Sequence, residues 1–149
     1  MNGRVVLALR DDIAPRAVAN FRELLSSGKL IGSPIHRVSA GGWIQGGDIV
    51  DGSGAHSEAA LPREGSKFVE DESFDLPHHT GTLSYANNGV HTNGSQYVLS
   101  VRPCPWLQGT RVAFGSVVFG LSFLRYLSNR PTENERPLAT VTLANGGDF

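Results

Sequence analysis

The sequence contains one cysteine, almost no net charge and no long hydrophobic run. The lone Cys104 excludes an intramolecular disulfide framework, and its place between two prolines favours a structural role in a turn. A net charge of -1 without a Lys/Arg cluster gives no electrostatic basis for binding nucleic acid or a membrane surface. A membrane-spanning helix needs about 20 apolar residues, and the opening MNGRVVLALRDD has too short an apolar run for a signal peptide. We therefore expect a cytosolic or nuclear protein.

Glycine, by contrast, is abundant, and its 18 residues gather in pairs and short clusters between apolar runs. Such punctuation is typical of a β-rich fold with tight connections. The length of 149 residues, of which 40% are hydrophobic and 18% charged, predicts a single globular domain over residues 1–149. The five histidines lack the spacing of metal ligands, so we predict neither a metal nor a cofactor.

Two helices are predicted from apolar residues at helical spacing. The first covers residues 14–26, with Asp11 and Asp12 expected near its N-cap and Pro15 in its first turn. The second covers about residues 121–129, ahead of a proline. Between and around them, short apolar runs predict strands at Arg4–Arg10, Ile35–Val38, Trp43–Gln45, Thr82–Ala86, Gln96–Val101, Arg111–Phe114, Ser116–Val118 and Ala139–Leu143.

The pattern as a whole predicts a mainly β fold: a closed or partly closed antiparallel barrel whose ends are covered by the two α-helices. Arg4–Arg10 is apolar on both faces, so we expect it to be buried. Residues 46–67 show no periodicity and are predicted to form a long loop. The charged segment Pro131–Pro137 suits either an exposed loop or a docking surface, and both interpretations stay open.

Two segments are richer in polar residues and glycine than strand formation requires. In the first, His36-Arg37 is followed eight residues later by Gln45-Gly46-Gly47-Asp48. In the second, Ala86-Asn87-Asn88-Gly89 is followed by Thr92-Asn93-Gly94-Ser95-Gln96. Together with FVEDESF at residues 68–74 and WL…VAFG at residues 106–115, these blocks resemble the cyclophilin family in order, spacing and identity.

The resemblance covers nearly the whole chain, from about Gly3 to Gly146. A finer match, carried by GWIQGGDIV at Gly42–Val50 and PTENERP at Pro131–Pro137, is to a divergent subgroup, peptidyl-prolyl isomerase-like protein six. That subgroup is similar to a cyclophilin subunit of ciliary radial spokes. The resemblance therefore implies proline-containing segments as ligands and a place in a larger assembly, with the cytoplasm and the ciliary axoneme as locations.

The family's fold is an eight-stranded antiparallel barrel capped by two helices, and its activity is cis–trans isomerisation of X-Pro bonds. Amide resonance opposes that rotation with a barrier of about 18–20 kcal/mol. A catalyst needs no nucleophile and no metal for this reaction. It needs a site that binds the twisted amide more tightly than either planar isomer.

Two residues match the family's catalytic positions. Arg37 corresponds to its essential arginine, whose guanidinium can donate to the prolyl nitrogen once resonance is lost. Gln45 would hold Arg37 and the substrate carbonyl in place. Taken alone, Arg37 would suit a surface ion pair, but the presence of Gln45, Asn87 and Gln96 at the matching positions favours catalysis. The resemblance assigns substrate binding to Asn87, Gln96, Ala86, Trp43, Val98, Trp106, Leu107 and Arg111, with Leu107 lining the proline pocket and Trp106 its rim.

The chain departs from the family in that pocket. Gly42 and Val98 stand where aromatic residues are usual, Arg111 stands where histidine is usual, and Trp43 replaces a methionine. Each lost aromatic wall removes about 1.5–3 kcal/mol of apolar contact if nothing replaces it. Trp43 either refills the space beside Gly42 or plugs the pocket, and the sequence leaves both outcomes open.

The match also begins at the family's second strand, so we expect the first strand to be missing and Arg4–Arg10 to have an exposed edge. An incomplete gene model would produce the same pattern. Two functions follow. One is a prolyl isomerase of reduced efficiency within a larger assembly. The other is a non-catalytic module that binds a proline-containing segment or serves a structural role there.

Overall fold

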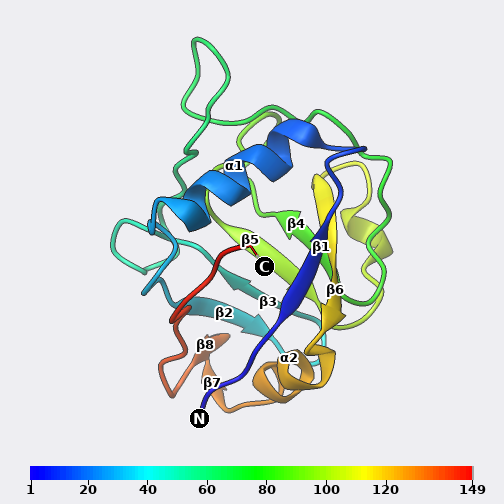
Figure 1. Cartoon of the computed structure of the whole chain (residues 1–149). Helices are drawn as coiled ribbons and strands as arrows, with labels where there is room; N and C mark the ends of the chain where they lie inside the picture. Colours follow the sequence, from blue (N-terminus) through cyan, green and yellow to red (C-terminus); the bar gives the residue numbers. More distant parts are fainter. Residues whose placement is uncertain (149) are drawn as a thin grey trace.

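The structure is a computed structural model that describes residues 1–148. Its centre is a six-stranded antiparallel sheet in the order β1-β6-β4-β5-β3-β2 (Figure 1). The strands of this sheet are β1 (Val6–Leu9), β2 (Ile35–Ser39), β3 (Trp43–Gly46), β4 (Thr82–Tyr85), β5 (Tyr97–Ser100) and β6 (Ala113–Phe119). A separate two-stranded hairpin consists of β7 (Thr132–Glu133) and β8 (Arg136–Pro137). The prediction of a mainly β fold is thus confirmed.

The two predicted helices are also confirmed, as α1 (Pro15–Ser26) and α2 (Leu121–Ser128). They lie at opposite ends of the sheet (Figure 1). Pro15 occupies the first turn of α1 as expected. The predicted acidic cap is wrong, because Ala14 stands at the N-cap without a side-chain bond and Asp12 pairs instead with Arg10 at 2.9 Å. A short 3-10 helix, η1 (Pro105–Leu107), was not predicted.

Of the two predicted alternatives, a closed or a partly closed barrel, the closed one is not formed, because the sheet is open and β1 and β2 are its edge strands. The exposed edge expected for Arg4–Arg10 is present as β1. The expected last strand, Ala139–Leu143, is reduced to a single bridge between Thr142 and Pro34. Backbone bonds tie this segment to the chain just before β2, for example from the Ile35 N–H to the Val141 carbonyl at 2.8 Å. Among residues 1–148 no strand pairs with its other side, so the ladder does not extend.

The remaining strands lie where predicted, with ends shifted by a few residues. The runs Arg111–Phe114 and Ser116–Val118 form one strand, because Gly115 continues the ladder opposite Leu9 and Leu83. β1 is half-buried rather than buried, since it is an edge strand paired only with β6. Residues 47–81 contain no helix and no regular strand, in agreement with the predicted long loop.

The core lies between α1 and the inner face of the sheet. Along β3, β4 and β5 the inner positions are apolar and buried, as Ile44, Leu83 and Leu99 show. Tyr85 stacks on Phe114 with ring centroids 4.4 Å apart, and its hydroxyl donates to a backbone carbonyl of α1 at 2.7 Å. Because side chains alternate between the two faces of a strand, the residues between these inner positions point outward.

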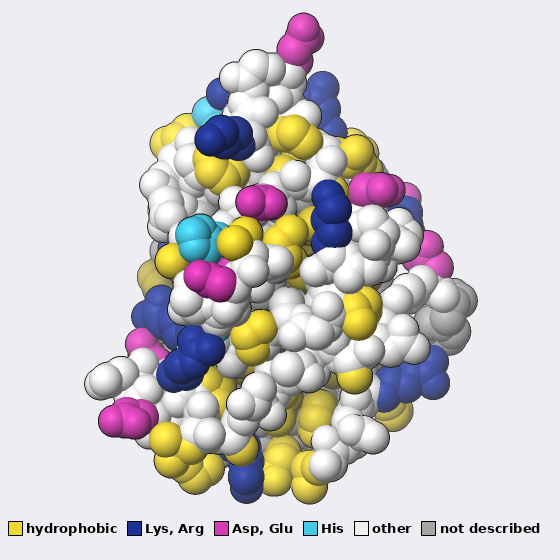
Figure 2. All heavy atoms as spheres, turned by 90° about the vertical axis from the view of Figure 1, so that its left-hand side faces the viewer, with side chains coloured by type: hydrophobic (Ala, Val, Ile, Leu, Met, Phe, Trp, Pro, Cys, Tyr) yellow, Lys and Arg dark blue, Asp and Glu magenta, His cyan; other side chains and the backbone are white. Residues whose placement is uncertain are grey.

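Two general features of the surface bear on function. Among residues 1–148, no helix combines the length and apolar character that crossing a bilayer requires. Acidic and basic side chains are interspersed with hydrophobic ones over the face that lies at the left of Figure 1, as Figure 2 shows. No charge of one sign dominates that face.

Candidate functional site

Strand register brings the predicted catalytic residues into one row across the outer face of the sheet. Arg37 on β2 pairs with Gln45 on β3, and Gln45 pairs with Val98 on β5. Val98 in turn pairs with Ser84 on β4. Adjacent strands are about 4.8 Å apart, so a bound peptide of a few residues could contact Arg37 and Gln45 together, whereas Val98 and Ser84 at the other end of the row are buried. The alternation of the strands thus produces the candidate site.

The side chain of Arg37 is 46% exposed, and it points toward the β7–β8 hairpin. Its Nε donates to Glu135 Oε1 at 3.1 Å, and its guanidinium carbon lies 5.6 Å from the centroid of the Trp43 ring. Within residues 1–148 it makes no hydrogen bond to Gln45, although the two residues are paired through their backbones. The guanidinium therefore contacts an acid and an aromatic ring, with part of its surface left for a ligand.

Gln45 is joined instead to Gln96, the residue just before β5. Its Nε2 donates to Gln96 Oε1 at 3.0 Å. Gln96 is 6% exposed, and its own Nε2 donates to the carbonyls of Gly54 and His56 at 2.9 and 2.8 Å. The two amides thus connect the row on the sheet to the loop beside it. We use the name polar arm for Arg37, Gln45, Asp48 and Gln96.

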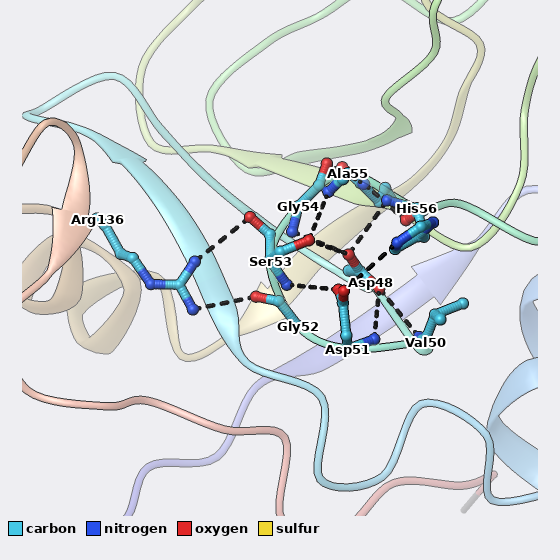
Figure 3. A network of polar contacts seen from close by, with 10 residues as sticks. Asp48, Val50, Asp51, Gly52, Ser53, Gly54, Ala55, His56 and Arg136 are labelled. Atoms are coloured by element: carbon cyan, nitrogen blue, oxygen red, sulfur yellow. Dashed lines mark hydrogen bonds and ion pairs between the residues drawn. The ribbon is translucent and has the colours of Figure 1, made fainter.

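The loop beside the row folds around the carboxylate of Asp48, which is 1% exposed (Figure 3). Oδ1 accepts the N–H groups of Val50 and Asp51, and Oδ2 accepts those of Gly54 and His56, all at 2.9–3.2 Å. Burial by itself would raise the pKa of Asp48, but these four donors favour the charged form and the net effect lowers the pKa. The carboxylate therefore stays ionised and fixes the carbonyls that hold Gln96.

Asn87 and Arg111 form a second polar pair on the far side of the row. Arg111 Nη1 donates to the Asn87 carbonyl at 3.0 Å and also contacts Asn87 Oδ1. The Asn87 side chain donates to the Thr110 carbonyl at 2.8 Å. Burial, followed by the positive charge of Arg37, lowers the pKa of Arg111. Asn87 is one of the residues to which the resemblance assigns substrate binding, and its main-chain carbonyl is already bonded within the chain.

We use the name proline wall for the apolar side of the site, which consists of Gly42, Trp43, Val98, Trp106 and Leu107. Trp43 is half-buried and its ring centroid lies 6.4 Å from that of Trp106, which is 52% exposed. Val98 is only 4% exposed, so it offers little surface to a ligand. Most of the apolar contact available to a bound proline would come from the two tryptophans and the half-buried Leu107.

The structure thus places the predicted site residues on one face, in two groups. Ala86 links them, because its N–H donates to the Gln96 carbonyl at 3.0 Å while it directly precedes Asn87. Sequence reasoning missed Glu135 and Arg102. Glu135 binds Arg37, and the Arg102 guanidinium carbon lies 5.5 Å from the Trp106 ring centroid. The charge at Pro131–Pro137 was the available signal for Glu135. Within residues 1–148, no cluster of three or more His, Cys, Asp or Glu could hold a metal ion.

Comparison with known proteins finds relatives that match nearly the whole chain. Three curated relatives carry the name "Probable inactive peptidyl-prolyl cis-trans isomerase-like 6". Those from Bos taurus and Homo sapiens are each 38% identical, over 99% and 98% of this chain, and that from Mus musculus is 40% identical over 97%. The matches cover 50%, 49% and 49% of the three proteins, so the chain spans about half the length of these relatives. Residues 1–147 match the profile of "Cyclophilin type peptidyl-prolyl cis-trans isomerase/CLD". The chain therefore belongs to the cyclophilin-type peptidyl-prolyl cis-trans isomerase family.

Proposed function

We propose that this chain binds proline-containing segments on the outer face of its sheet and isomerises their X-Pro bonds at a reduced rate. The observation that carries the proposal is the row Arg37–Gln45–Val98 on three adjacent strands. A segment lying along this row would present its prolyl amide to the Arg37 guanidinium while its proline ring rests on the proline wall.

The chemistry follows from the groups at that position. When the X-Pro amide twists, the nitrogen regains its lone pair and becomes a hydrogen-bond acceptor. A guanidinium donor then binds the twisted state more strongly than either planar state, which is the requirement for catalysis. Gln45 and Gln96 would hold the main chain on one side of the bond, so that only the other side turns.

The rate is expected to be low because much of the polar site is already satisfied within the chain. Arg37 is paired with Glu135 and the Asn87 carbonyl with Arg111. A substrate therefore meets a guanidinium whose charge is partly neutralised and a carbonyl that already accepts a hydrogen bond. The same observation supports the second candidate function, a module that binds a proline-containing segment without turning it over. The names of the relatives describe those proteins as probable inactive isomerases, which favours the second candidate function.

The experiment is a protease-coupled isomerisation assay on X-Pro tetrapeptides, with wild type, Arg37→Ala and Arg125→Ala. Arg125 is an exposed arginine on α2 and serves as the matched control. We expect wild type to exceed the uncatalysed rate, Arg37→Ala to lose about 100-fold in kcat/KM, and Arg125→Ala to equal wild type. Equal rates for wild type and Arg37→Ala, both at the uncatalysed level, would exclude catalysis. Peptide binding retained in that case would support the module.

We further propose, from the subgroup resemblance, that the whole protein works as a subunit of a larger assembly, with the ciliary radial spoke as the candidate and the cytoplasm or axoneme as its location. The test is to tag the full-length protein and measure its co-fractionation with isolated radial spokes. Stoichiometric co-fractionation is expected. A full-length protein that runs as a monomer and is absent from isolated axonemes would contradict it.

A further inference from the structure

The β7–β8 hairpin carries Glu135 at its turn, in a conformation that ordinary residues adopt only at a cost. Asn134 and Glu135 have φ values of 50° and 65°. Two successive residues with positive φ are typical of a type I′ hairpin turn, in which Asn is favoured and Glu is not. Such a conformation is unfavourable for a non-glycine residue, and it persists where surrounding contacts fix it.

Those contacts attach the hairpin to both sides of the polar arm. On one side, the Glu135 carbonyl accepts the Val38 N–H at 2.7 Å, next to Arg37 on β2. On the other, the Arg136 guanidinium donates to the carbonyls of Gly52 and Ser53 at 3.0 and 3.4 Å (Figure 3). Gly52 and Ser53 belong to the loop that folds around Asp48. The hairpin is therefore held by its backbone on β2 and by Arg136 on the loop.

This attachment places the Glu135 carboxylate on the donor that the proposed reaction needs. Glu135 Oε1 lies 3.1 Å from Arg37 Nε, and the two side chains are 47% and 46% exposed. A carboxylate at this distance partly neutralises the guanidinium and occupies one of its N–H groups. An exposed pair of this kind is weak enough for a ligand to displace.

We propose that Glu135 is a positioning residue that competes with the substrate amide for Arg37 and so limits the activity of the site. The proposal rests on the proposed function, because it concerns the same arginine. In the free protein Glu135 holds Arg37 toward the hairpin. The carboxylate occupies Nε and partly neutralises the guanidinium, so the remaining N–H groups donate more weakly to the twisted amide and the transition state is stabilised less.

The test compares Glu135→Gln with Glu133→Gln. Glu133 is an exposed residue of the same hairpin, paired in register with Arg136, and its carboxylate is not seen to bind a cation among residues 1–148. Gln keeps the shape and length of Glu, so the hairpin contacts made by the backbone are retained. We expect Glu135→Gln to raise kcat/KM about twofold to fivefold, which corresponds to the loss of an exposed ion pair. Glu133→Gln should equal wild type.

Two additional measurements connect the effect to Arg37. The double variant Arg37→Ala/Glu135→Gln should be as inactive as Arg37→Ala, because the gain requires the guanidinium. Salt should also raise the activity of wild type on a neutral peptide between about 0.1 and 1 M NaCl, where the Debye length falls from roughly 10 to 3 Å. Glu135→Gln should show no such rise.

The outcomes separate this inference from the proposed function. If Arg37→Ala is inactive and Glu135→Gln is no faster than wild type, the competition is wrong while the isomerase stands. If all proteins turn over at the uncatalysed rate, the isomerase is wrong, and titration with a proline-containing peptide decides the competition. Tighter binding by Glu135→Gln than by Glu133→Gln would then support it, and equal binding would overturn it.

Discussion

The polar arm and the proline wall occupy the same face of one sheet, yet they are built in opposite ways. In the polar arm, Asp48 and Gln96 are buried and each makes several hydrogen bonds that fix the loop beside the strands. In the proline wall, Trp106 is half exposed. Ser84 and Ser100, which pair in register with Val98 and Trp43 of the wall, are fully buried, and their hydroxyls have no hydrogen-bond partner within residues 1–148.

The difference indicates which half of such a site tolerates amino-acid substitution. A buried polar network requires all its members at once, since a buried group that loses its partner costs about 1–3 kcal/mol. An apolar surface tolerates replacement as long as volume is roughly kept. This agrees with the sequence. The polar arm resembles the family throughout, whereas in the proline wall Trp106 and Leu107 resemble it and Gly42, Trp43 and Val98 depart from it.

Substitution of a glycine is expected to affect stability very differently in the two halves. Gly47, in the polar arm loop, has φ of 97°, and a Cβ there would collide with the backbone of Ser95 and Gln96. Gly42, in the wall, has no such backbone constraint, and the nearest atom to a Cβ is the Ser39 hydroxyl at 3.1 Å, which can rotate away. We expect Gly47→Ala to lower the free energy of unfolding by about 3 kcal/mol or more, and Gly42→Ala to change it by less than about 1 kcal/mol.

Urea denaturation followed by circular dichroism measures both variants, with wild type as the reference. A loss of similar size in the two would mean that the loop of the polar arm relaxes as easily as the wall. That result would remove the distinction between the two halves.

Much of the fold and the row of site residues could be predicted from the sequence alone. The apolar spacing predicted α1 to within one residue, and it predicted the strands that carry Arg37, Gln45 and Val98. Because register follows from alternation along antiparallel strands, the row of site residues could be expected once these strands were placed. The motif residues therefore came together on one face.

The partner of Arg37 could not be foreseen from spacing. It is Glu135, 98 residues away in the chain, on a hairpin whose turn has positive φ without glycine. Local propensity disfavours that turn, and contacts distant in sequence decide it. The open sheet, in contrast, agrees with the exposed edge expected for Arg4–Arg10, whereas the reduction of Ala139–Leu143 to a single bridge depends on its pairing and not on the segment itself.

The next largest effect is expected at the carboxylate of the polar arm. Asp48→Asn replaces one acceptor oxygen with an NH2 group. That group faces either the N–H groups of Val50 and Asp51 or those of Gly54 and His56, and it leaves that pair of donors unsatisfied. We expect a loss of about 2–3 kcal/mol in the free energy of unfolding at pH 7. Asp51→Asn is the matched control, because Asp51 is an exposed loop residue, and it should cost less than about 1 kcal/mol.

Wild type and Asp48→Asn are also expected to differ in their stability at acid pH. The folded state lowers the pKa of Asp48 below its unfolded value of about 3.9. The stabilisation from its ionised form is therefore complete above that unfolded pKa and is lost as the pH falls toward the folded pKa. Wild type should lose stability below about pH 4 more steeply than Asp48→Asn. Parallel acid profiles for the two proteins would show that the carboxylate is not the group that holds the loop.

The smallest effect is expected where the two halves meet, at Arg111. Its guanidinium donates to the Asn87 carbonyl, and this bond occupies a main-chain acceptor that a bound segment could use. Arg111→His removes the long donor and restores the residue usual in the family. The folded state should lose about 0.5–1.5 kcal/mol, the contribution of a typical hydrogen bond. The freed carbonyl should in turn strengthen binding of a proline-containing peptide about twofold to fivefold, measured by the fluorescence of Trp43 and Trp106. Binding that weakens in step with stability would show that Arg111 supports the binding surface rather than obstructing it. Glu135 and the altered wall would then be the only proposed causes of a reduced activity.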